Sequence, residues 1–316
     1  MKIRPHFEIS VLGRKVQLGE RTLIMGVLNA TPDSFSDGGL YLDADAAIAR
    51  GVEMARQGAD WIDVGGESTR PGSQPVSPEE ELTRVLPVIR GLRRRLRSVP
   101  ISIDTSKALV ASQAVEAGAA ILNDISGLRF DPELAEVAHR SGTPLVLMHL
   151  RGRPHDMQKR PFARSIWRSL QEGLERSIHR ALERGVCRSQ LILDPGLGFG
   201  KTRAQNFEIL AQLERLKRFR LPILVGSSRK SFVRAVGSGK ALIPRPSAQG
   251  RRAGRAKRAE NSLSEHLPYS DAAAVTAAIL NGAHIVRVHD VKQIAPAVRI
   301  ADAVAQSAGR GRWQRS

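Results

Sequence analysis

Cysteine, aromatic residues and long apolar runs are all scarce in this chain of 316 residues. The single cysteine, Cys187, excludes a disulfide framework within the chain, and a reducing cytosol is the natural setting for such a sequence. No apolar run approaches the roughly 20 residues of a membrane span, and Met1–Ser10 lacks the apolar centre of a signal peptide. We therefore expect a soluble, cytoplasmic protein with no membrane partner.

Acidic residues are outnumbered, because 49 Lys and Arg stand against 31 Asp and Glu and give a formal net charge of +18. Such an excess favours small anionic substrates. Aromatic residues make up only 4% of the chain, which leaves little material for the stacking platforms of single-strand nucleic-acid binders. Many arginines also fall on helical stretches such as Arg90–Arg97, where a solvated helix face explains them. We expect no nucleic-acid partner beyond nonspecific contact.

Eight short apolar runs recur along the chain, each rich in Ile, Val and Leu and each followed by a turn and a helical pattern. Parallel strands that are buried on both faces have this pattern. The count predicts an α/β fold, a (β/α)8 TIM barrel, as a single domain over residues 1–316, since such barrels need roughly 250 residues. The predicted strands are 23–29, 61–66, 101–104, 121–124, 144–149, 191–194, 222–227 and 284–290. The predicted helices are 44–57, 78–96, 107–117, 132–140, 164–185, 204–218, 230–236, 271–281 and 294–305.

Three segments lie outside this repeat. Residues 7–20 alternate around Leu12-Gly13-Arg14-Lys15 and predict an N-terminal β-hairpin at the bottom of the barrel. Residues 237–266 are rich in Gly, Pro, Ser and Arg, so we expect a basic, disordered or mobile insertion between strands seven and eight. Residues 309–316 predict a flexible tail. The basic cluster of the insertion fits either a solvated loop or a contact for a polyanion or a partner, and it comprises Arg251, Arg252, Arg255, Lys257 and Arg258.

Polar residues stand at the ends of the predicted strands, where the loops of a TIM barrel build the active site. Asp104, Asn123 and Asp194 end three of the strands, and Lys230 lies just beyond the seventh. Two carboxylates, an amide and an ammonium group that converge in one place suit the edge of a flat heterocycle with several donors and acceptors. Taken singly, Asp104 or Asn123 is equally well explained as a cap for local backbone groups.

Strand eight ends in Arg287-Val288-His289-Asp290. Because side chains alternate along a strand, Arg287 and His289 point to the same side, and at the mouth of a barrel this pair makes an anion site. Phe199 lies in a glycine-rich stretch, Asp194–Lys201, where it either stacks on a ring or seats the loop. His149, after strand five, is interpreted as part of a pocket wall rather than as a nucleophile.

Two further loops follow strands one and two. Leu28–Gly39 contains Asn29 and Asp33 and is dense in Thr, Ser, Asp and Gly, which suits a mobile lid over a site. Gly65–Gly72 contains Arg70, whose planar guanidinium fits a carboxylate or a phosphate. Each loop alone is also consistent with a structural turn.

Seven segments together resemble dihydropteroate synthases and occur in the order of that family. The resemblance spans about residues 10–305 apart from the insertion, and no single short motif decides it. The segments are Met25–Gly39, Gly65–Gly72, Asp104–Lys107, Asn123–Ile125, Asp194–Lys201, Ser228–Lys230 and Arg287–Val291.

The resemblance implies a transferase that joins 6-hydroxymethyl-7,8-dihydropterin diphosphate to p-aminobenzoate and releases 7,8-dihydropteroate and pyrophosphate for folate synthesis. It also implies Mg²⁺ as cofactor and a homodimer. We expect the bond from the pterin methylene carbon to oxygen to break before the amine attacks, because the electron-rich ring can delocalise the cation that forms.

The same resemblance assigns a role to each candidate residue. The pterin is expected among Asp104, Asn123, Asp194 and Lys230, with Arg287 against its face. The diphosphate is expected near Asn29, Arg70, Arg287 and His289, with Mg²⁺ on Asn29. The p-aminobenzoate is expected near Thr69, Pro71, Phe199 and Ser228. Catalysis is assigned to Asn29, Asp33, Arg70, Lys230, Arg287 and His289.

Two alternatives remain open at this point. A corrinoid-dependent pterin methyltransferase shares the pterin clamp but has no use for a diphosphate site. A non-catalytic, polyanion-binding paralogue would keep the barrel and use the basic insertion.

Overall fold

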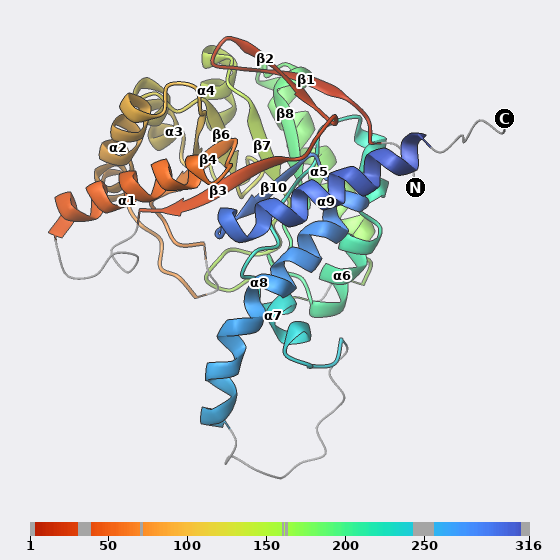
Figure 1. Cartoon of the computed structure of the whole chain (residues 1–316). Helices are drawn as coiled ribbons and strands as arrows, with labels where there is room; N and C mark the ends of the chain where they lie inside the picture. The colour runs from red at the N-terminus through yellow and green to blue at the C-terminus, as the bar shows by residue number, and fades with distance from the viewer. Residues whose placement is uncertain are drawn as a thin grey trace.

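Eight parallel strands form a barrel at the centre of the molecule, in the order β8-β7-β6-β5-β4-β3-β10-β9 (Figure 1). The computed structural model describes residues 4–30, 39–69, 72–159, 161, 164–242 and 256–310. A bridge between Leu193 and Ile223 joins β8 to β9 and closes the ring. The TIM barrel predicted from the sequence is thereby confirmed. The strands are β3 Leu23–Asn29, β4 Trp61–Gly65, β5 Ile101–Asp104, β6 Ile121–Asp124, β7 Leu145–Met148, β8 Leu191–Asp194, β9 Leu224–Val225 and β10 Ile285–Val288.

Helices cover the outside of the barrel (Figure 1), and their ends carry recognisable signals. Helix α2 begins after Ser77, whose hydroxyl accepts a hydrogen bond from the Glu80 amide at 3.1 Å. Glutamates fill its first turn and arginines its last, which complements the helix dipole. The helices are α1 Gly39–Arg56, α2 Pro78–Arg95, α3 Ala108–Glu116, α4 Leu134–Ser141, α5 Ile166–Glu183, α6 Arg203–Ala211, α7 Ser231–Gly237, α8 Ala256–Leu280 and α9 Val291–Arg310. None of the described helices is long and apolar enough to cross a membrane.

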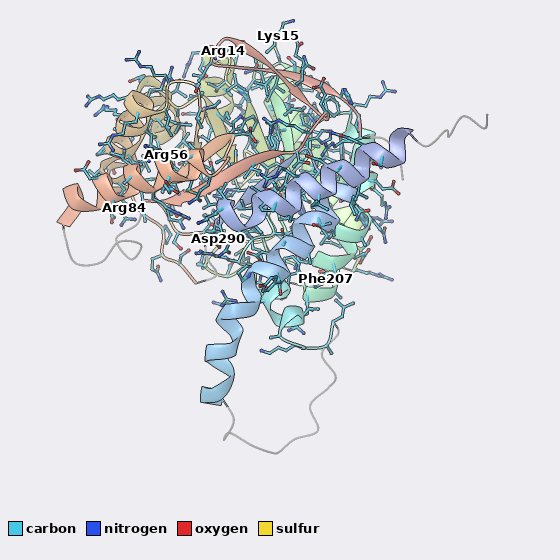
Figure 2. All side chains as sticks on the ribbon, in the orientation of Figure 1. Arg14, Lys15, Arg56, Arg84, Phe207 and Asp290 are labelled. Carbon is cyan, nitrogen blue, oxygen red and sulfur yellow. The ribbon has the colours of Figure 1, made fainter. Side chains whose placement is uncertain are left out.

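The predicted hairpin is present and consists of β1 Phe7–Val11 and β2 Arg14–Leu18. Leu12 and Gly13 both have positive φ at its turn, as a two-residue hairpin loop requires, and Figure 2 labels Arg14 and Lys15 beside that turn. Ile9, Val11 and Leu18 pack against residues at the starts of the barrel strands, such as Trp61 and Ile121. The hairpin therefore covers the N-terminal end of the barrel, and the interior of the barrel opens at the other end.

The structure differs from the sequence-based expectation between strands seven and eight. We expected an irregular insertion over 237–266, but α8 begins at Ala256, and Pro268 lies inside this helix. The sequence after Ala256 contains the strong helix formers Ala, Lys, Arg, Glu and Leu, whereas Gly and Pro are concentrated before it. Residues 243–255 lie outside the described part of the chain, and with them Arg251, Arg252 and Arg255.

Smaller differences concern the ends of elements. The predicted helix 204–218 is divided into α6 and a 3₁₀ helix, Leu213–Phe219. Strand β9 has two paired residues, fewer than the predicted 222–227. The expected tail begins later than predicted, because α9 continues to Arg310, and residues 311–316 lie outside the described part.

Candidate functional site

The register of the barrel places several of the predicted site residues at one level of its C-terminal end. Asn29 pairs with Gly65, Gly65 with Asp104, and Asp104 with Asn123. Asp194 ends β8 opposite Met148. Because the C-terminal ends of parallel strands meet at the same rim, residues scattered over 165 positions from Asn29 to Asp194 surround a single opening.

Arg287 lies at the centre of this group. Its Nε donates to Asp63 Oδ2 and its Nη2 to Asp104 Oδ2, both at 2.6 Å. The amide of Asn123 donates to the same oxygen of Asp63 at 3.0 Å. Charge-assisted bonds of this kind fix the guanidinium in one orientation. Four side chains from β4, β5, β6 and β10 therefore form one continuous polar network across the barrel.

Asp63 was missed by reasoning from the sequence. It is fully buried in β4, and its Oδ1 atom has no hydrogen-bond partner among the described residues. The available signal was a charged residue inside the apolar run Trp61-Ile62-Asp63-Val64. A buried carboxylate is costly unless it is paired, so its position called for a partner cation on another strand.

Burial and neighbouring charges shift the pKa values of the titratable groups at this rim. Desolvation raises the pKa of Asp104, and the positive charge of Arg287 opposes the rise. Desolvation raises the pKa of Asp194 to about 6, against the hydrogen bond from the Gly196 amide. Burial, aided by the charge of Arg287, lowers the pKa of Lys230 to about 8. Burial thus brings the pKa of Asp194 and the pKa of Lys230 toward neutrality, as is common at functional sites.

Lys230 and Phe199 meet on the side of the opening formed by the loops after β8 and β9. The Lys230 ammonium lies 4.0 Å from the centroid of the Phe199 ring, which is a cation–π geometry. Phe199 is buried against Met148, Leu150 and Met157. The ring thus seats its loop, as one of the two sequence interpretations held, and also contacts the ammonium.

Hydrogen bonds and close packing hold the backbone of the loop after Asp194 in one conformation. The Gly196 amide donates to Asp194 Oδ1 at 2.6 Å, and a Cβ at Gly196 would lie 2.2 Å from the His149 carbonyl oxygen. The buried ammonium of Lys201 donates to the carbonyls of His149, Gly196 and Phe199. Lys201 therefore stabilises the loop that carries Asp194 and Phe199.

Ser228 is positioned by Asp271, a second residue that the sequence interpretation missed. The Ser228 hydroxyl donates to Asp271 Oδ2 at 2.8 Å, and the Arg229 amide donates to the same carboxylate. His289 Nδ1 lies 3.3 Å from the Ser228 hydroxyl. Asp271 stands at the start of the predicted helix 271–281, and no local pattern indicates its contact with Ser228, which lies 43 residues away in the sequence.

The remaining predicted residues belong to the loops after β3 and β4. Asn29 is half-buried at the end of β3, and Thr69 is half-buried in the next loop. Lys107 pairs with Glu67 and with the buried Glu81, which anchors the base of that loop. Asp33, Arg70 and Pro71 lie outside the described residues.

A resident metal site made of protein ligands alone is not found among the described residues, where no group of three or more His, Cys, Asp or Glu side chains is suitably placed. Asn29 supplies one neutral amide oxygen at the rim. This donor fits a hard cation such as Mg²⁺ that keeps water ligands and takes further oxygens from a bound phosphate.

The barrel, the closed lower end and the polar rim define a TIM-barrel enzyme that binds a small polar ligand at its C-terminal face. Residues 25–289 match the family described as "Pterin binding enzyme". The chain is 44% identical to a dihydropteroate synthase of Synechocystis over 90% of this chain and 91% of the relative. It is 42% identical to the Bacillus subtilis dihydropteroate synthase, with 92% and 91% covered. The chain belongs to the dihydropteroate synthase family of pterin-binding enzymes.

Solved structures agree with this family. The Yersinia pestis dihydropteroate synthase in complex with a sulfonamide drug aligns with a TM-score of 0.81 at 38% identity, covering 95% of this chain and all of that one. A Xanthomonas albilineans dihydropteroate synthase with 4-aminobenzoic acid also aligns with a TM-score of 0.81, at 35% identity, covering 95% and 98%.

Proposed function

We propose that this chain is a dihydropteroate synthase. It joins 6-hydroxymethyl-7,8-dihydropterin diphosphate to p-aminobenzoate and releases pyrophosphate. The observation that carries this proposal is the convergence of Asp104, Asn123, Asp194, Lys230 and Arg287 around one opening of the barrel. A methyltransferase that acts on a pterin could use the same clamp, but none of the curated relatives reported above carries that function.

The pterin ring binds at the depth of Asp194 and Asn123. Its exocyclic amino group and ring N–H form a pair of donors that suits the Asp194 carboxylate, and its carbonyl accepts from Lys230. Asp104 and Asn123 provide further polar contacts from the neighbouring strands. The Arg287 guanidinium, held by Asp63 and Asp104, gives the ring a flat cationic surface.

The diphosphate lies nearer the rim, by Asn29, Arg70, Arg287 and His289. His289 and Arg287 both come from the end of β10, and their side chains are partly exposed. Asn29 would hold Mg²⁺ through its amide oxygen, and the bound ion would supply positive charge that stabilises the leaving diphosphate. The cationic side chains Arg70 and Arg287 stabilise the same charge from the protein.

The p-aminobenzoate lies between the loops that contain Thr69, Pro71, Phe199 and Ser228. The Ser228 hydroxyl is oriented by Asp271, and Phe199 offers an apolar surface beside Lys230. With p-aminobenzoate in this position, we expect its amine to face the methylene carbon of the pterin.

The reaction proceeds by dissociation. The bond between the methylene carbon and the diphosphate oxygen breaks, and the oxygen keeps the electron pair. The amine nitrogen of p-aminobenzoate then attacks the methylene cation, and the nitrogen loses a proton to solvent. No protein nucleophile takes part, so neither a phosphorylated nor a pterin-linked enzyme forms. Rapid-quench analysis that trapped such an adduct would contradict this order.

Two copies of the chain pair through α8 and α9. Helix α9 exposes 67% of Ile300 and 48% of Val304, and α8 exposes 76% of Tyr269. Exposed apolar residues on adjacent helices favour a protein interface, and α8 packs closely on α9. Sedimentation of the purified chain measures this assembly directly.

The central test is an assay with purified protein. Incubation with the pterin diphosphate, p-aminobenzoate and Mg²⁺ should yield 7,8-dihydropteroate and pyrophosphate in equal amounts. Transfer of a methyl group from a methylated pterin to a corrinoid protein is the contrary outcome.

A further inference from the structure

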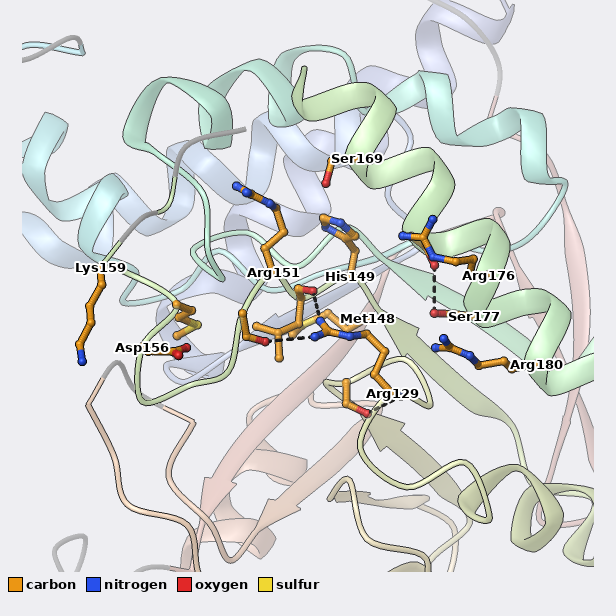
Figure 3. A pocket seen from close by; sticks show the side chains of 15 residues that line it. Arg129, Met148, His149, Arg151, Asp156, Lys159, Ser169, Arg176, Ser177 and Arg180 are labelled. Carbon is orange, nitrogen blue, oxygen red and sulfur yellow. Dashed lines mark hydrogen bonds between the residues drawn. The ribbon is translucent and has the colours of Figure 1, made fainter. Parts of the chain in front are cut away.

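A second pocket lies beside the site described above, next to the C-terminal ends of β6 and β7. Its volume is about 660 Å³, and it lies between the loop after β6, the segment that follows β7, and α5. Figure 3 shows its lining, with Arg129 and Met148 on one side and Arg176 and Arg180 projecting from α5 on the other. None of Asp104, Asn123, Asp194, Lys230 and Arg287 lines it. The pocket therefore borders the proposed synthase site at Met148 but contains none of the polar side chains of its clamp.

Positive charge dominates this pocket. Arg129, Arg151, Lys159, Arg176 and Arg180 line it together with one acidic residue, Asp156. The Asp156 carboxylate accepts a hydrogen bond from the Arg153 amide at 3.0 Å, so it is occupied within its own loop.

The arginines repel one another. Burial lowers the pKa of Arg129, and the charges of Arg180, Arg153 and Arg176 lower it further. Arg129 nevertheless stays in place because its guanidinium donates to the carbonyls of Leu150 and Gly152. An anion that binds between like charges in a concave site reduces the repulsion between them.

His149 adds an independent observation. The side chain lines the pocket and is only 6% exposed, and its Nδ1 atom has no hydrogen-bond partner among the described residues. Its ring packs against α5 at Gly173, where a Cβ would lie 2.5 Å from His149 Cδ2. Burial and the charges of Lys201 and Arg151 lower the pKa of His149, so the ring is neutral, and Nδ1 is an acceptor that takes a water or a protonated phosphate oxygen.

We propose that this pocket is a second anion site, which binds the phosphoryl groups of a polyphosphate through Arg129, Arg176 and Arg180. Guanidinium groups match phosphate oxygens in pairs, and Arg is the residue best suited to this recognition. A volume of about 660 Å³ exceeds the needs of a single phosphate and accommodates a chain of them or the polyphosphate end of a nucleotide. The proposal does not depend on the synthase activity.

Calorimetric titration with inorganic tripolyphosphate at constant ionic strength tests the proposal. The wild-type chain should bind two equivalents, one at the rim of the barrel and one in this pocket. The double variant Arg176→Gln/Arg180→Gln should lose one equivalent or bind it at least tenfold more weakly. The control Arg94→Gln/Arg95→Gln removes the same charge from exposed positions on α2 and should keep both equivalents.

The outcomes separate this site from the synthase. If the rim of the barrel binds no polyphosphate, the wild-type chain should bind one equivalent, in this pocket. The α5 double variant should then lose that equivalent. Binding by the α5 variant that equals wild type, with an unchanged circular dichroism spectrum, overturns the proposal, as does equal weakening in the α2 control. Repeating the titration with ATP assigns the phosphate chain to a nucleotide if ATP binds as tightly, and to free polyphosphate if ATP binds more weakly.

Discussion

Arg287 and Asp63 form an ion pair of 2.6 Å across the barrel, although 224 residues separate them in the sequence. They belong to β10 and β4, which are not neighbours in the sheet, because β3 lies between them. The contact therefore passes through the interior of the barrel rather than along a ladder of paired strands. The ion pair connects β10 to β4 and holds the Arg287 guanidinium inside the barrel, below its C-terminal opening.

Removal of the Asp63 carboxylate should destabilise the fold. Asp63→Ala leaves the Asn123 amide without its acceptor and leaves Arg287 with Asp104 as its one remaining carboxylate partner among the described residues. Removing one partner of a buried ion pair costs about 3–5 kcal/mol. Equilibrium unfolding in urea measures the change. Glu136→Gln, which removes an exposed pair with Arg140 on α4, should change the free energy of unfolding by less than about 0.5 kcal/mol. Equal losses in both variants would contradict a special role for Asp63.

Loss of the Lys230 ammonium should impair turnover while the fold is retained. Lys230→Ala removes a charged donor to the pterin carbonyl, which is worth about 1.5–3 kcal/mol, and kcat/KM should fall roughly 10- to 100-fold. Steady-state kinetics measures the loss and circular dichroism checks the fold. Lys240→Ala, at an exposed position after α7, should behave as wild type. Near-normal activity of Lys230→Ala is the result that removes Lys230 from the pterin site.

Pterin affinity should fall in acid. The pKa of Asp194 is raised from 3.8 to about 6 by burial, so the carboxyl is protonated below about pH 6 and then cannot accept two donors. Affinity for 6-hydroxymethylpterin should level off above that pH and weaken about tenfold per unit below it. Because its pKa is raised, Asp194 binds a proton more tightly in the folded state than in the unfolded state. Its contribution to the free energy of unfolding therefore falls as pH rises from 3.8 to about 6.

Fluorescence titration of the pterin between pH 5 and pH 8 provides the measurement. Asp194→Asn should bind weakly and show a flatter dependence on pH. A wild-type affinity that rises in acid would exclude an ionised Asp194 as the acceptor.

Asp271 should affect p-aminobenzoate through Ser228. Asp271→Asn exchanges a charged acceptor for a neutral one at the Ser228 hydroxyl and the Arg229 amide, a loss of about 1 kcal/mol. The KM for p-aminobenzoate should rise roughly fivefold, while the KM for the pterin substrate changes little. Asp290→Asn, which removes the exposed pair with Arg229, should have the smaller effect. A change confined to the pterin KM would contradict the proposed geometry.

The Mg²⁺ concentration that the enzyme requires for activity should depend on Asn29. Removal of Mg²⁺ should weaken turnover, and Asn29→Ala should raise the Mg²⁺ concentration that gives half-maximal activity, because the variant loses an oxygen ligand. Affinity for 6-hydroxymethylpterin, which lacks the diphosphate, should stay unchanged in the same variant. Metal titration of the steady-state rate makes the comparison, and a Mg²⁺ requirement equal to wild type would remove Asn29 from the metal site.

The barrel and the residues at the strand ends were predictable because each strand is a short apolar run with a polar end. Asp104, Asn123 and Asp194 could be found from that local pattern, and the fold brings them to one rim. Asp63 and Asp271 could not, because their roles depend on partners that arrive from distant parts of the chain. Local composition also gave a wrong prediction at the start of α8. The composition averaged over residues 237–266 is that of a loop, although the residues that follow Ala256 are helix formers.

The hairpin at the N-terminal end affects how substrates and products enter and leave the barrel. Ile9, Val11 and Leu18 cover the lower end of the barrel, so we expect substrates and products to pass through the opening at its C-terminal end. The proposed site puts the bicyclic ring deepest, so we expect this ring to enter before the amine and the joined product to leave with its ring last. In this proposal, residues of the hairpin that contact neither substrate determine the order of binding and release.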